Sequence, residues 1–281
     1  MIVAKIKRDG RSASAVIVDE TARLIGPWER QLPIIAGFDA PSLSLDELRS
    51  LSHVATEVVP LAGVGLAPPA GPMSKLICLG LNYRNHVEET LNDVPEYPAL
   101  FTKIADVLVG QAEPIIRPKV STHFDYEGEI TVIIGRAGRH IVREEALSHV
   151  FGYTIMLDGS VRDYQKHSAS AGKNFWHSGS LGPWIRTADE IPDPSALTLE
   201  TRLNGQTVQS ATADLMLYDI PSAISYISRW TPLAPGDVIA MGTPGGVGAQ
   251  RKPPLWMKHG DTIEVEVSSI GVLRNSVKDE E

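Results

Sequence analysis

The sequence Asp125-Tyr126-Glu127-Gly128-Glu129 leads directly into the apolar run Ile130-Thr131-Val132-Ile133-Ile134, which predicts a buried strand. Successive side chains of a strand alternate between its two faces, so Glu127 and Glu129 should project from the same side with a glycine between them. Like charges held that close share either a proton or a cation. The pair therefore predicts a divalent metal site, with a solvated strand edge as the alternative. We expect the strand to begin after Asp125, which leaves that residue in a turn.

Length and composition place the chain among ordinary globular proteins. It has 281 residues, of which 43% are hydrophobic and 21% charged, enough for one large domain and a small appendage. The formal net charge of -8 argues against nucleic-acid and acidic-membrane partners, so an anionic substrate would need local positive charge. No apolar run approaches the ~20 residues that span a bilayer, and none at the N-terminus suits a signal peptide, so we expect a cytoplasmic protein. The single cysteine, Cys78, lies in an apolar run and is expected in the core.

Residues 1–72 are predicted to form a small α+β N-terminal domain and linker. Segments 3–6 and 15–18 flank Asp9-Gly10, a pattern typical of a hairpin whose turn accepts positive φ. Prolines and glycines accumulate over residues 60–72, which predicts a linker and a domain boundary near residue 73.

A short helix is also expected in this N-terminal domain. Ser44 is a suitable N-cap, and Glu47 three residues later completes a capping box. Leu45, Leu48 and Leu51 would then form an apolar stripe that packs on the hairpin.

Residues 73–281 are predicted to form a second, larger domain. Its strand-like runs are short and separated by glycine and proline, which favours a β-rich α+β domain over alternating βαβ units. These runs are residues 76–79, 130–134, 154–157, 197–203, 238–241 and 262–267.

Few helices are expected in this larger domain. The clearest begins at Asp219 as a cap, with Pro221 in the first turn and Ala223, Ile224, Ile227 and Trp230 on one face. Two further helices are predicted over residues 84–91 and 143–150.

Asp158 is a candidate third ligand for the metal. It ends the strand-like run Tyr153-Thr154-Ile155-Met156-Leu157, where a carboxylate would lie at a loop mouth. Three carboxylates suit magnesium, manganese or calcium better than zinc. A helix cap is the alternative interpretation of Asp158.

Other polar residues suggest chemistry around such a metal. His86 and Glu89 are three residues apart, so on a helix they share a face and can hydrogen-bond, although a surface ion pair has the same spacing. Lys173, between glycine and aromatic residues, would suit a substrate carboxylate or a developing charge, and a solvated surface lysine is the alternative. Residues 241–248, Met-Gly-Thr-Pro-Gly-Gly-Val-Gly, would present a hydroxyl and amides to an anion or form only a turn, and they match no nucleotide-binding motif.

Taken together, these segments resemble the fumarylacetoacetate hydrolase family over roughly residues 75–277. The resemblance rests on five segments in the family's order: Gly80-Leu81-Asn82-Tyr83-Arg84-Asn85-His86-Val87-Glu88-Glu89, residues 125–135, Leu157-Asp158-Gly159-Ser160-Val161-Arg162-Asp163-Tyr164-Gln165, Gly172-Lys173 and Gly242-Thr243-Pro244. The residues before them resemble the small N-terminal domain of many members.

The resemblance implies a β-rich roll or sandwich with Mg²⁺ or Mn²⁺, or Ca²⁺ in vitro, on Glu127, Glu129 and Asp158. It implies a homodimer and a His86–Glu89 dyad on a segment that orders over the site when ligand binds. It implies that His86, Glu89 and Lys173 are catalytic. Lys173, Gln165 and Thr243 match positions that contact substrate or stabilise its charge, with Arg162 near the metal and Lys103 as a further contact. Ile104 departs from the family, where a proline usually follows the lysine, and this makes the placement of Lys103 an open question.

The resulting functional hypothesis is metal-dependent hydrolysis of a carbon–carbon bond in a β-diketo acid, of the acylpyruvate or diketo sugar acid type. The alternative is a 2-oxo diacid decarboxylase of the oxaloacetate type, or a 2-hydroxy-dienedioate isomerase, at the same site. A metal-stabilised binding protein without catalysis is a third hypothesis. The substrate would be a small anionic 2-oxo acid, with residues 92–98, Trp176 and Trp256 as candidate specificity determinants.

Overall fold

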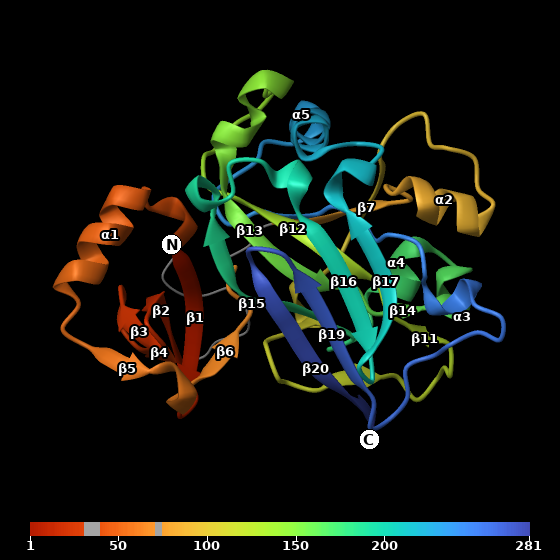
Figure 1. The fold of residues 1–281 in the computed structure, drawn as a ribbon, viewed down its shortest axis with the longest axis horizontal. Coiled ribbons are helices and arrows are strands. Elements are labelled where there is room, and N and C mark those ends of the chain that lie inside the picture. Colours follow the sequence, from red (N-terminus) through yellow and green to blue (C-terminus); the bar gives the residue numbers. More distant parts are fainter. Residues whose placement is uncertain (31–39, 71–74) are drawn as a thin grey trace.

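The computed structural model describes residues 1–30, 40–70 and 75–281 (Figure 1). Within these ranges the largest sheet has 13 strands: β1 (Ile2–Arg8), β2 (Arg11–Val18), β3 (Thr21–Leu24), β4 (Glu29–Arg30), β5 (Val58–Pro60), β6 (Gly65–Ala67), β7 (Leu76–Gly80), β8 (Ala99–Thr102), β9 (Leu108–Val109), β12 (Gly128–Ile134), β13 (Val150–Leu157), β15 (Gly179–Thr187) and β18 (Val238–Ala240). Its main path is β5-β3-β2-β1-β15-β13-β12-β18-β7-β8, and β4, β6 and β9 pair with β2, β1 and β15.

A second sheet packs against the centre of the first. It has the order β10-β20-β19-β16-β17, and β11 and β14 form a separate pair. These strands are β10 (Ile115–Arg117), β11 (Phe124–Asp125), β14 (Ser160–Val161), β16 (Thr198–Leu203), β17 (Gln206–Thr212), β19 (Thr262–Val267) and β20 (Gly271–Asp279). The helices are α1 (Leu45–Val54), α2 (Arg84–Thr90), α3 (Arg162–Gln165), α4 (Ala169–Lys173) and α5 (Ile220–Trp230), with 3-10 turns η1 (Ala40–Ser42), η2 (Leu61–Gly63), η3 (Ala105–Val107), η4 (Arg143–His149), η5 (Ala188–Glu190), η6 (Pro194–Ala196), η7 (Ala213–Leu215) and η8 (Gly248–Gln250).

The strand-rich α+β class expected from the sequence is confirmed. All six predicted strand-like runs coincide with strands, and most neighbouring strands are antiparallel. Cys78 is fully buried in β7, as expected. Among the described residues there is no helix with the length and apolarity to cross a membrane.

The N-terminal hairpin and helix follow their sequence signals. Asp9 and Gly10 adopt φ of 51° and 68° in the turn between β1 and β2, as a two-residue hairpin requires. At α1, Ser44 Oγ accepts from the Glu47 amide at 3.2 Å, and the Glu47 carboxylate accepts from the Ser44 amide at 2.7 Å. Leu48 is fully buried in the cluster that contains Val16 of β2, so the helix packs on the hairpin.

The predicted linker is wrong for part of its length. Residues 65–67 form β6, which pairs with β1 through Ile6–Leu66, and Val58–Pro60 form β5. Leu66 and Ile6 belong to the same buried cluster, so even a three-residue strand helps to cover the second face of the hairpin. The predicted boundary near residue 73 and the end of the linker lie outside the described residues.

The N-terminal strands are continuous with the rest of the large sheet. Ile2 and Val3 of β1 pair with Arg186 and Ile185 of β15. In Figure 1 the N-terminal strands lie at the left, and the sheet extends from them to the right. The division into residues 1–72 and 73–281 stays a prediction.

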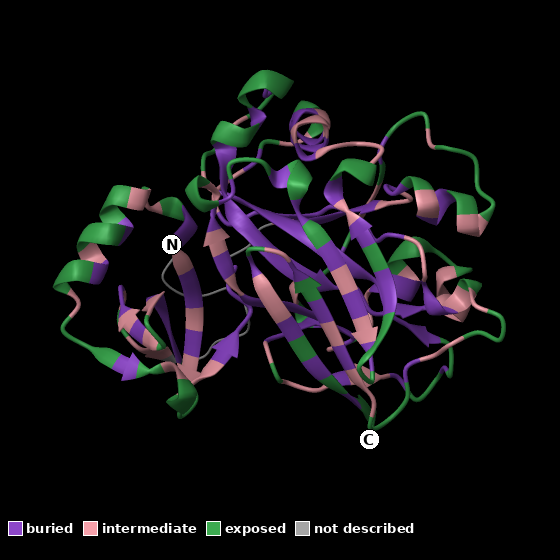
Figure 2. Ribbon diagram, in the orientation of Figure 1, coloured by how far each residue is buried: buried purple, intermediate pink, exposed green. Residues whose placement is uncertain are grey.

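The strand β12 is enclosed from both sides, and Figure 2 shows it buried along its length. A Cβ built on Gly128 would lie 2.3 Å from Thr201 Oγ1 and 2.9 Å from Val265, so this position faces the second sheet and accommodates only glycine. Because side chains alternate, Glu127 and Glu129 face the opposite side, as expected.

Two helix predictions need correction. The predicted helix over residues 143–150 is the 3-10 turn η4, and Val150 already belongs to β13, because its backbone pairs with β12. In α5, Asp219 caps the helix and Ala223, Ile224 and Ile227 are buried, but Trp230 is 52% exposed. The helix ends at Trp230, whose side chain lines a surface groove with Tyr226 and residues of β8.

Candidate active site

The structure brings Glu127, Glu129 and Asp158 together. Carboxylate oxygens of all three lie within 4.8 Å of one another, and the three side chains are buried. Strand pairing explains this: Gly128 pairs with Leu157, and the Asp158 amide donates to the Glu127 carbonyl at 2.8 Å. The pairing of β12 with β13 thus brings the Glu127 carboxylate, just before β12, close to the Asp158 carboxylate, just after β13.

Glu129 is the member of the cluster that has no cationic partner among the described residues. Its carboxylate accepts from the Gly242 amide at 3.1 Å, whereas no ion pair with a cationic side chain is found for it in the described part of the chain. Burial raises its pKa well above the ordinary value, and the Asp158 and Glu127 carboxylates raise it further. Three buried oxygen donors with one unneutralised carboxylate fit a hard divalent cation.

Asp158 is held by two lysines. Lys103 Nζ lies 2.6 Å from Oδ1, and Lys173 Nζ lies 2.8 Å from Oδ2. Lys103 is buried, also donates to the Lys173 carbonyl, and is not among the described residues that line the cavity. The geometry therefore favours a role in fixing Asp158 over the predicted contact with substrate.

The departure at Ile104 has a local compensation. The Ile104 amide donates to Asn174 Oδ1 at 2.7 Å, a hydrogen bond that a proline cannot make. Asn174 directly follows Lys173, so this bond ties the end of β8 to the end of α4 where both lysines lie.

Glu127 is neutralised by two cationic side chains. Burial alone would raise its pKa, but Lys173, Arg162 and His86 outweigh burial and lower the pKa to about 2. Lys173 donates to the same carboxylate, and Arg162 Nη2 lies 2.7 Å from its other oxygen. Burial would lower the pKa of Lys173, yet Asp158 and Glu127 raise it overall, so the ammonium stays charged.

Asp125 has a defined position that sequence reasoning missed. It lies in β11, paired with Ser160, rather than in a turn. Its buried carboxylate accepts from Arg162 Nε at 2.8 Å and from the amides of Gly248 and Ala249 at 2.7 and 3.0 Å. The strand was missed because β11 has only two residues. The available signal was that Asp125, like Glu127 and Glu129, has an odd residue number.

The predicted His86–Glu89 contact is present. On α2, His86 Nδ1 and Glu89 Oε1 are 2.7 Å apart, and Glu89 Oε2 accepts from the Gly246 amide at 2.8 Å. His86 is 7% exposed and lines the cavity. A carboxylate that is itself fixed orients the imidazole, and Nε2 is left as the nitrogen available to a ligand.

The glycine-rich segment 242–249 binds the protein's own carboxylates. Its amides at Gly242, Gly246 and Gly248 donate to Glu129, Glu89 and Asp125, respectively. These amides are therefore engaged within the chain and do not serve as the free anion cradle considered from the sequence. The segment instead connects the acidic cluster, the dyad and the Arg162 ion pair.

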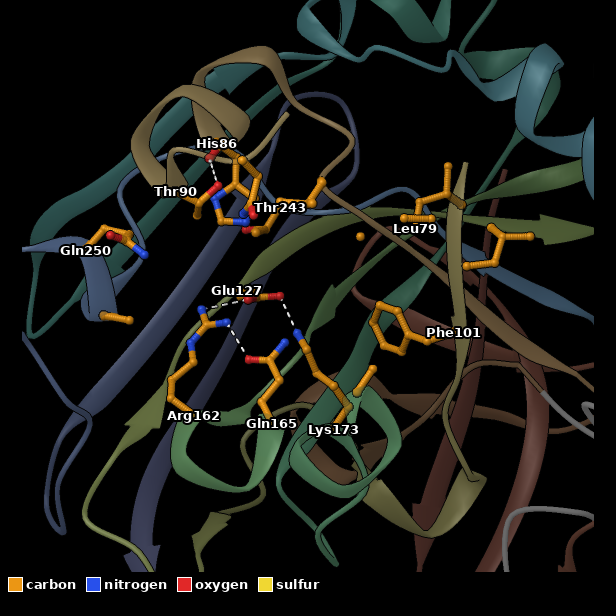
Figure 3. A pocket seen from close by; sticks show the side chains of 17 residues that line it. Leu79, His86, Thr90, Phe101, Glu127, Arg162, Gln165, Lys173, Thr243 and Gln250 are labelled. Atoms are coloured by element: carbon orange, nitrogen blue, oxygen red, sulfur yellow. Dashed lines mark hydrogen bonds and ion pairs between the residues drawn. The ribbon is translucent and has the colours of Figure 1, made fainter. Parts of the chain in front are cut away.

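A cavity of about 480 Å³ lies above the cluster. Figure 3 shows His86, Thr90 and Thr243 on one side of it, Arg162, Gln165 and Lys173 on the other, and Glu127 between them. Gln165 Oε1 accepts from Arg162 Nη1 at 2.9 Å. The described lining also contains Asn92 from the predicted specificity segment, and it includes neither Trp176 nor Trp256.

The strand-rich fold with this acidic cluster at its centre is that of the fumarylacetoacetate hydrolase family, to which the chain belongs. The sequence model described as fumarylacetoacetate (FAA) hydrolase C-terminal matches residues 75–278. This confirms the family expected from the sequence.

Curated relatives carry a more specific activity. The chain is 37% identical over 223 residues to the mitochondrial oxaloacetate tautomerase Fahd2a of Rattus norvegicus, covering 78% of this chain and 71% of the relative. It is 38% identical over 237 residues to oxaloacetate tautomerase YisK of Bacillus subtilis (strain 168), covering 83% and 77%.

Solved structures of the same fold have other names. Maleylpyruvate hydrolase from Sphingobium sp. SYK-6 matches with a TM-score of 0.81 and 28% identity, covering 100% of both chains. A 2-hydroxyhepta-2,4-diene-1,7-dioate isomerase from Mycobacterium marinum matches with a TM-score of 0.78 and 30% identity, covering 100% of this chain and 99% of the other. The similar proteins thus include tautomerases, isomerases and hydrolases of small organic acids.

Proposed function

We propose that this chain interconverts the keto and enol forms of a small 2-oxo diacid such as oxaloacetate. The observation that carries the proposal is the carboxylate-held imidazole of His86, which lines the cavity across from Lys173 and Arg162. Removal of a proton from the carbon beside an oxo group is favoured by a base at the C–H bond and by positive charge that stabilises the enolate oxygen. The names of the curated relatives support the same reaction.

The reaction needs only a proton shuttle. His86 removes a proton from the carbon between the oxo group and the second carboxylate, and the protonated imidazole returns that proton, directly or through water, to the carbonyl oxygen to give the enol. The reverse transfer regenerates the keto form. Only C–H and O–H bonds change, so no co-reactant is consumed. Glu89 keeps the imidazole oriented and stabilises its protonated form.

We propose Glu127, Glu129 and Asp158 as the ligands of Mg²⁺ or Mn²⁺, with Ca²⁺ as a substitute in vitro. When bound, the metal would supply a Lewis acid that stabilises negative charge on the oxo oxygen. Lys173, Gln165, Thr243 and Arg162 line the cavity and would contact the anionic substrate. Lys103, predicted as a further contact, is proposed instead to fix Asp158.

A second candidate is hydrolytic cleavage of a carbon–carbon bond in an acylpyruvate or diketo sugar acid. The same dyad favours it, since an oriented imidazole can deprotonate water for attack on a carbonyl. Decarboxylation of a 2-oxo diacid, in contrast, needs no base. Catalysis as such, a homodimer and a cytoplasmic location stay predictions.

An assay with oxaloacetate and a second one with acylpyruvates separate the three reactions. Enol oxaloacetate is mixed with the Mg²⁺-loaded protein, and the enol is followed by its ultraviolet absorbance while a dehydrogenase reports pyruvate. Rapid loss of the enol without pyruvate is expected, and His86→Ala should return the rate to that of buffer. Pyruvate formation retained in His86→Ala would contradict the proposal in favour of decarboxylation. Cleavage of acylpyruvates with no change in enol decay would favour hydrolysis.

A further inference from the structure

Gln209, in β17, makes three hydrogen bonds from a side chain that is 2% exposed. Its Oε1 accepts from the Gly128 amide at 3.0 Å. Its Nε2 donates to the Pro244 carbonyl at 2.9 Å and to Thr243 Oγ1 at 2.8 Å. Gln209 lies outside the segments that carry the family resemblance, and it connects the strand of the acidic cluster to the cavity wall.

The orientation of the Gln209 amide is fixed by two backbone groups. The Gly128 N–H can only donate and the Pro244 carbonyl can only accept. A flipped amide would place its NH₂ group against the Gly128 N–H and its oxygen against the Pro244 carbonyl, and both contacts would be repulsive. The polarity seen at Thr243 therefore follows from the backbone rather than from a choice between two amide orientations.

This polarity decides what the Thr243 hydroxyl can do. Both hydrogens of Gln209 Nε2 are engaged, one with Pro244 and one with Thr243. Because Thr243 Oγ1 accepts from Gln209, its own hydrogen points elsewhere. Thr243 lines the cavity on the side opposite Arg162, Gln165 and Lys173 (Figure 3), so the hydrogen is available to a ligand there.

We infer that Gln209 is a positioning residue that makes the Thr243 hydroxyl a hydrogen-bond donor to an anionic oxygen of the substrate. A freely rotating hydroxyl donates or accepts as its neighbour requires, whereas a hydroxyl of fixed polarity favours a carboxylate or enolate oxygen. The inference rests on the proposed function, because it takes the ligand to be a 2-oxo acid. It adds that the Thr243 hydroxyl is the group that recognises an anionic oxygen of this acid.

Binding of oxalate in the presence of Mg²⁺, measured by titration calorimetry, tests the inference without turnover. Oxalate has the adjacent oxygens of a 2-oxo acid and cannot enolise. Thr243→Val should weaken binding by about ten-fold or more, the value of a hydrogen bond to a charged group, while Thr243→Ser should bind close to wild type. This pair leaves the contacts of Gln209 with the backbone in place.

The role of Gln209 requires a double-mutant cycle. When ionised, the side chain of Gln209→Glu can only accept, so the Thr243 hydroxyl would turn toward it and be lost to oxalate. Titrations at several pH values check that the introduced carboxyl is ionised. Gln209→Glu should therefore weaken binding more in the wild-type background than in the Thr243→Val background. Gln206→Glu adds the same charge at an exposed position of β17 and serves as the control, and urea unfolding checks each variant.

Three results would overturn the inference: equal effects of Gln209→Glu in both backgrounds, wild-type affinity in Thr243→Val, or no oxalate binding by the Mg²⁺-loaded wild type. The expected coupling between Gln209 and Thr243 in oxalate binding, found in a protein that fails to interconvert keto and enol forms, would contradict the proposed reaction and still support the role of Gln209.

Discussion

Asp125 and Glu127 share the guanidinium of Arg162: Nε donates to Asp125 at 2.8 Å, and Nη2 lies 2.7 Å from Glu127. Burial would lower the pKa of Arg162, but the two carboxylates raise it above the ordinary value, so the group stays charged. The two carboxylates of this short segment therefore have different roles. Asp125 holds the Arg162 guanidinium in place, and the guanidinium in turn holds Glu127 beside Glu129 and Asp158.

Asp125→Asn is expected to destabilise the protein by about 3–5 kcal/mol, because it breaks a buried ion pair and leaves the Arg162 charge with one partner. Urea unfolding measures the change. Asp193→Asn, at an exposed capping position, is the matched control and should change stability far less, because asparagine also caps. A loss as small as that of the control would show that the Asp125 ion pair contributes little.

Glu129→Gln is expected to abolish Mn²⁺ binding and yet to stabilise the metal-free protein. The substitution removes the one triad carboxylate that no described cation neutralises, and with it the repulsion from Asp158 and Glu127. Thermal melting should show Mn²⁺ raising the midpoint of the wild type and leaving the variant unchanged. A variant that still gains stability from Mn²⁺ would argue against Glu129 as a ligand.

Asn85→Ala is expected to loosen α2. Asn85 Oδ1 accepts from the Gly245 amide at 3.1 Å, next to the bond between Gly246 and Glu89, so the two bonds hold the helix over the cavity. Loss of one bond worth ~1 kcal/mol should increase amide hydrogen exchange in α2 roughly five-fold. Glu88→Ala, at an exposed position of the same helix, is the control. Unchanged exchange in Asn85→Ala would mean that other contacts hold the helix.

The Asp219 cap should give stability a pH dependence of known sign. Burial raises the pKa of Asp219, but hydrogen bonds from Ser222 and the charge of Arg143 lower it overall. Stability from this carboxylate is therefore complete above its unfolded pKa of about 3.9 and is lost as the pH falls through the lower folded pKa. Asp219→Ala should cost ~1 kcal/mol near neutral pH, and the cost should shrink below about pH 4.

Urea unfolding at several pH values measures this dependence. Asp219→Asn keeps a capping oxygen without the charge and is the control. A cost of Asp219→Ala that stays constant with pH would place its origin outside the carboxylate charge.

Features set by neighbours in the sequence were predictable. Strand alternation placed Glu127 and Glu129 on one face, and helix periodicity paired His86 with Glu89. The capping box of α1 likewise spans only three residues. In each case the backbone geometry of one element determines the contact, so the residue types and their spacing were sufficient.

Contacts between distant segments were not predictable in the same way. Lys103 and Asp158 are 55 residues apart, and Gln209 and Gly128 are 81 apart. Each contact depends on strand order and on the close approach of the two sheets, which no local pattern encodes. The position of Asp158 at the end of a strand-like run, together with the family resemblance, suggested it as a ligand, but neither offered a signal for Gln209 or for the partners of Asp125.

The pairing of β1 with β15 gives the N-terminal strands a protective task. Without them, β15 would end the sheet with unsatisfied amides and carbonyls, and the apolar side chains of Leu181 and Ile185, which pack with Val3 and Leu48, would be bared. A chain cut to residues 75–281 would keep every member of the triad and the dyad. We expect such a fragment to fail by aggregation, through an open strand edge that recruits other copies, rather than by loss of its chemistry.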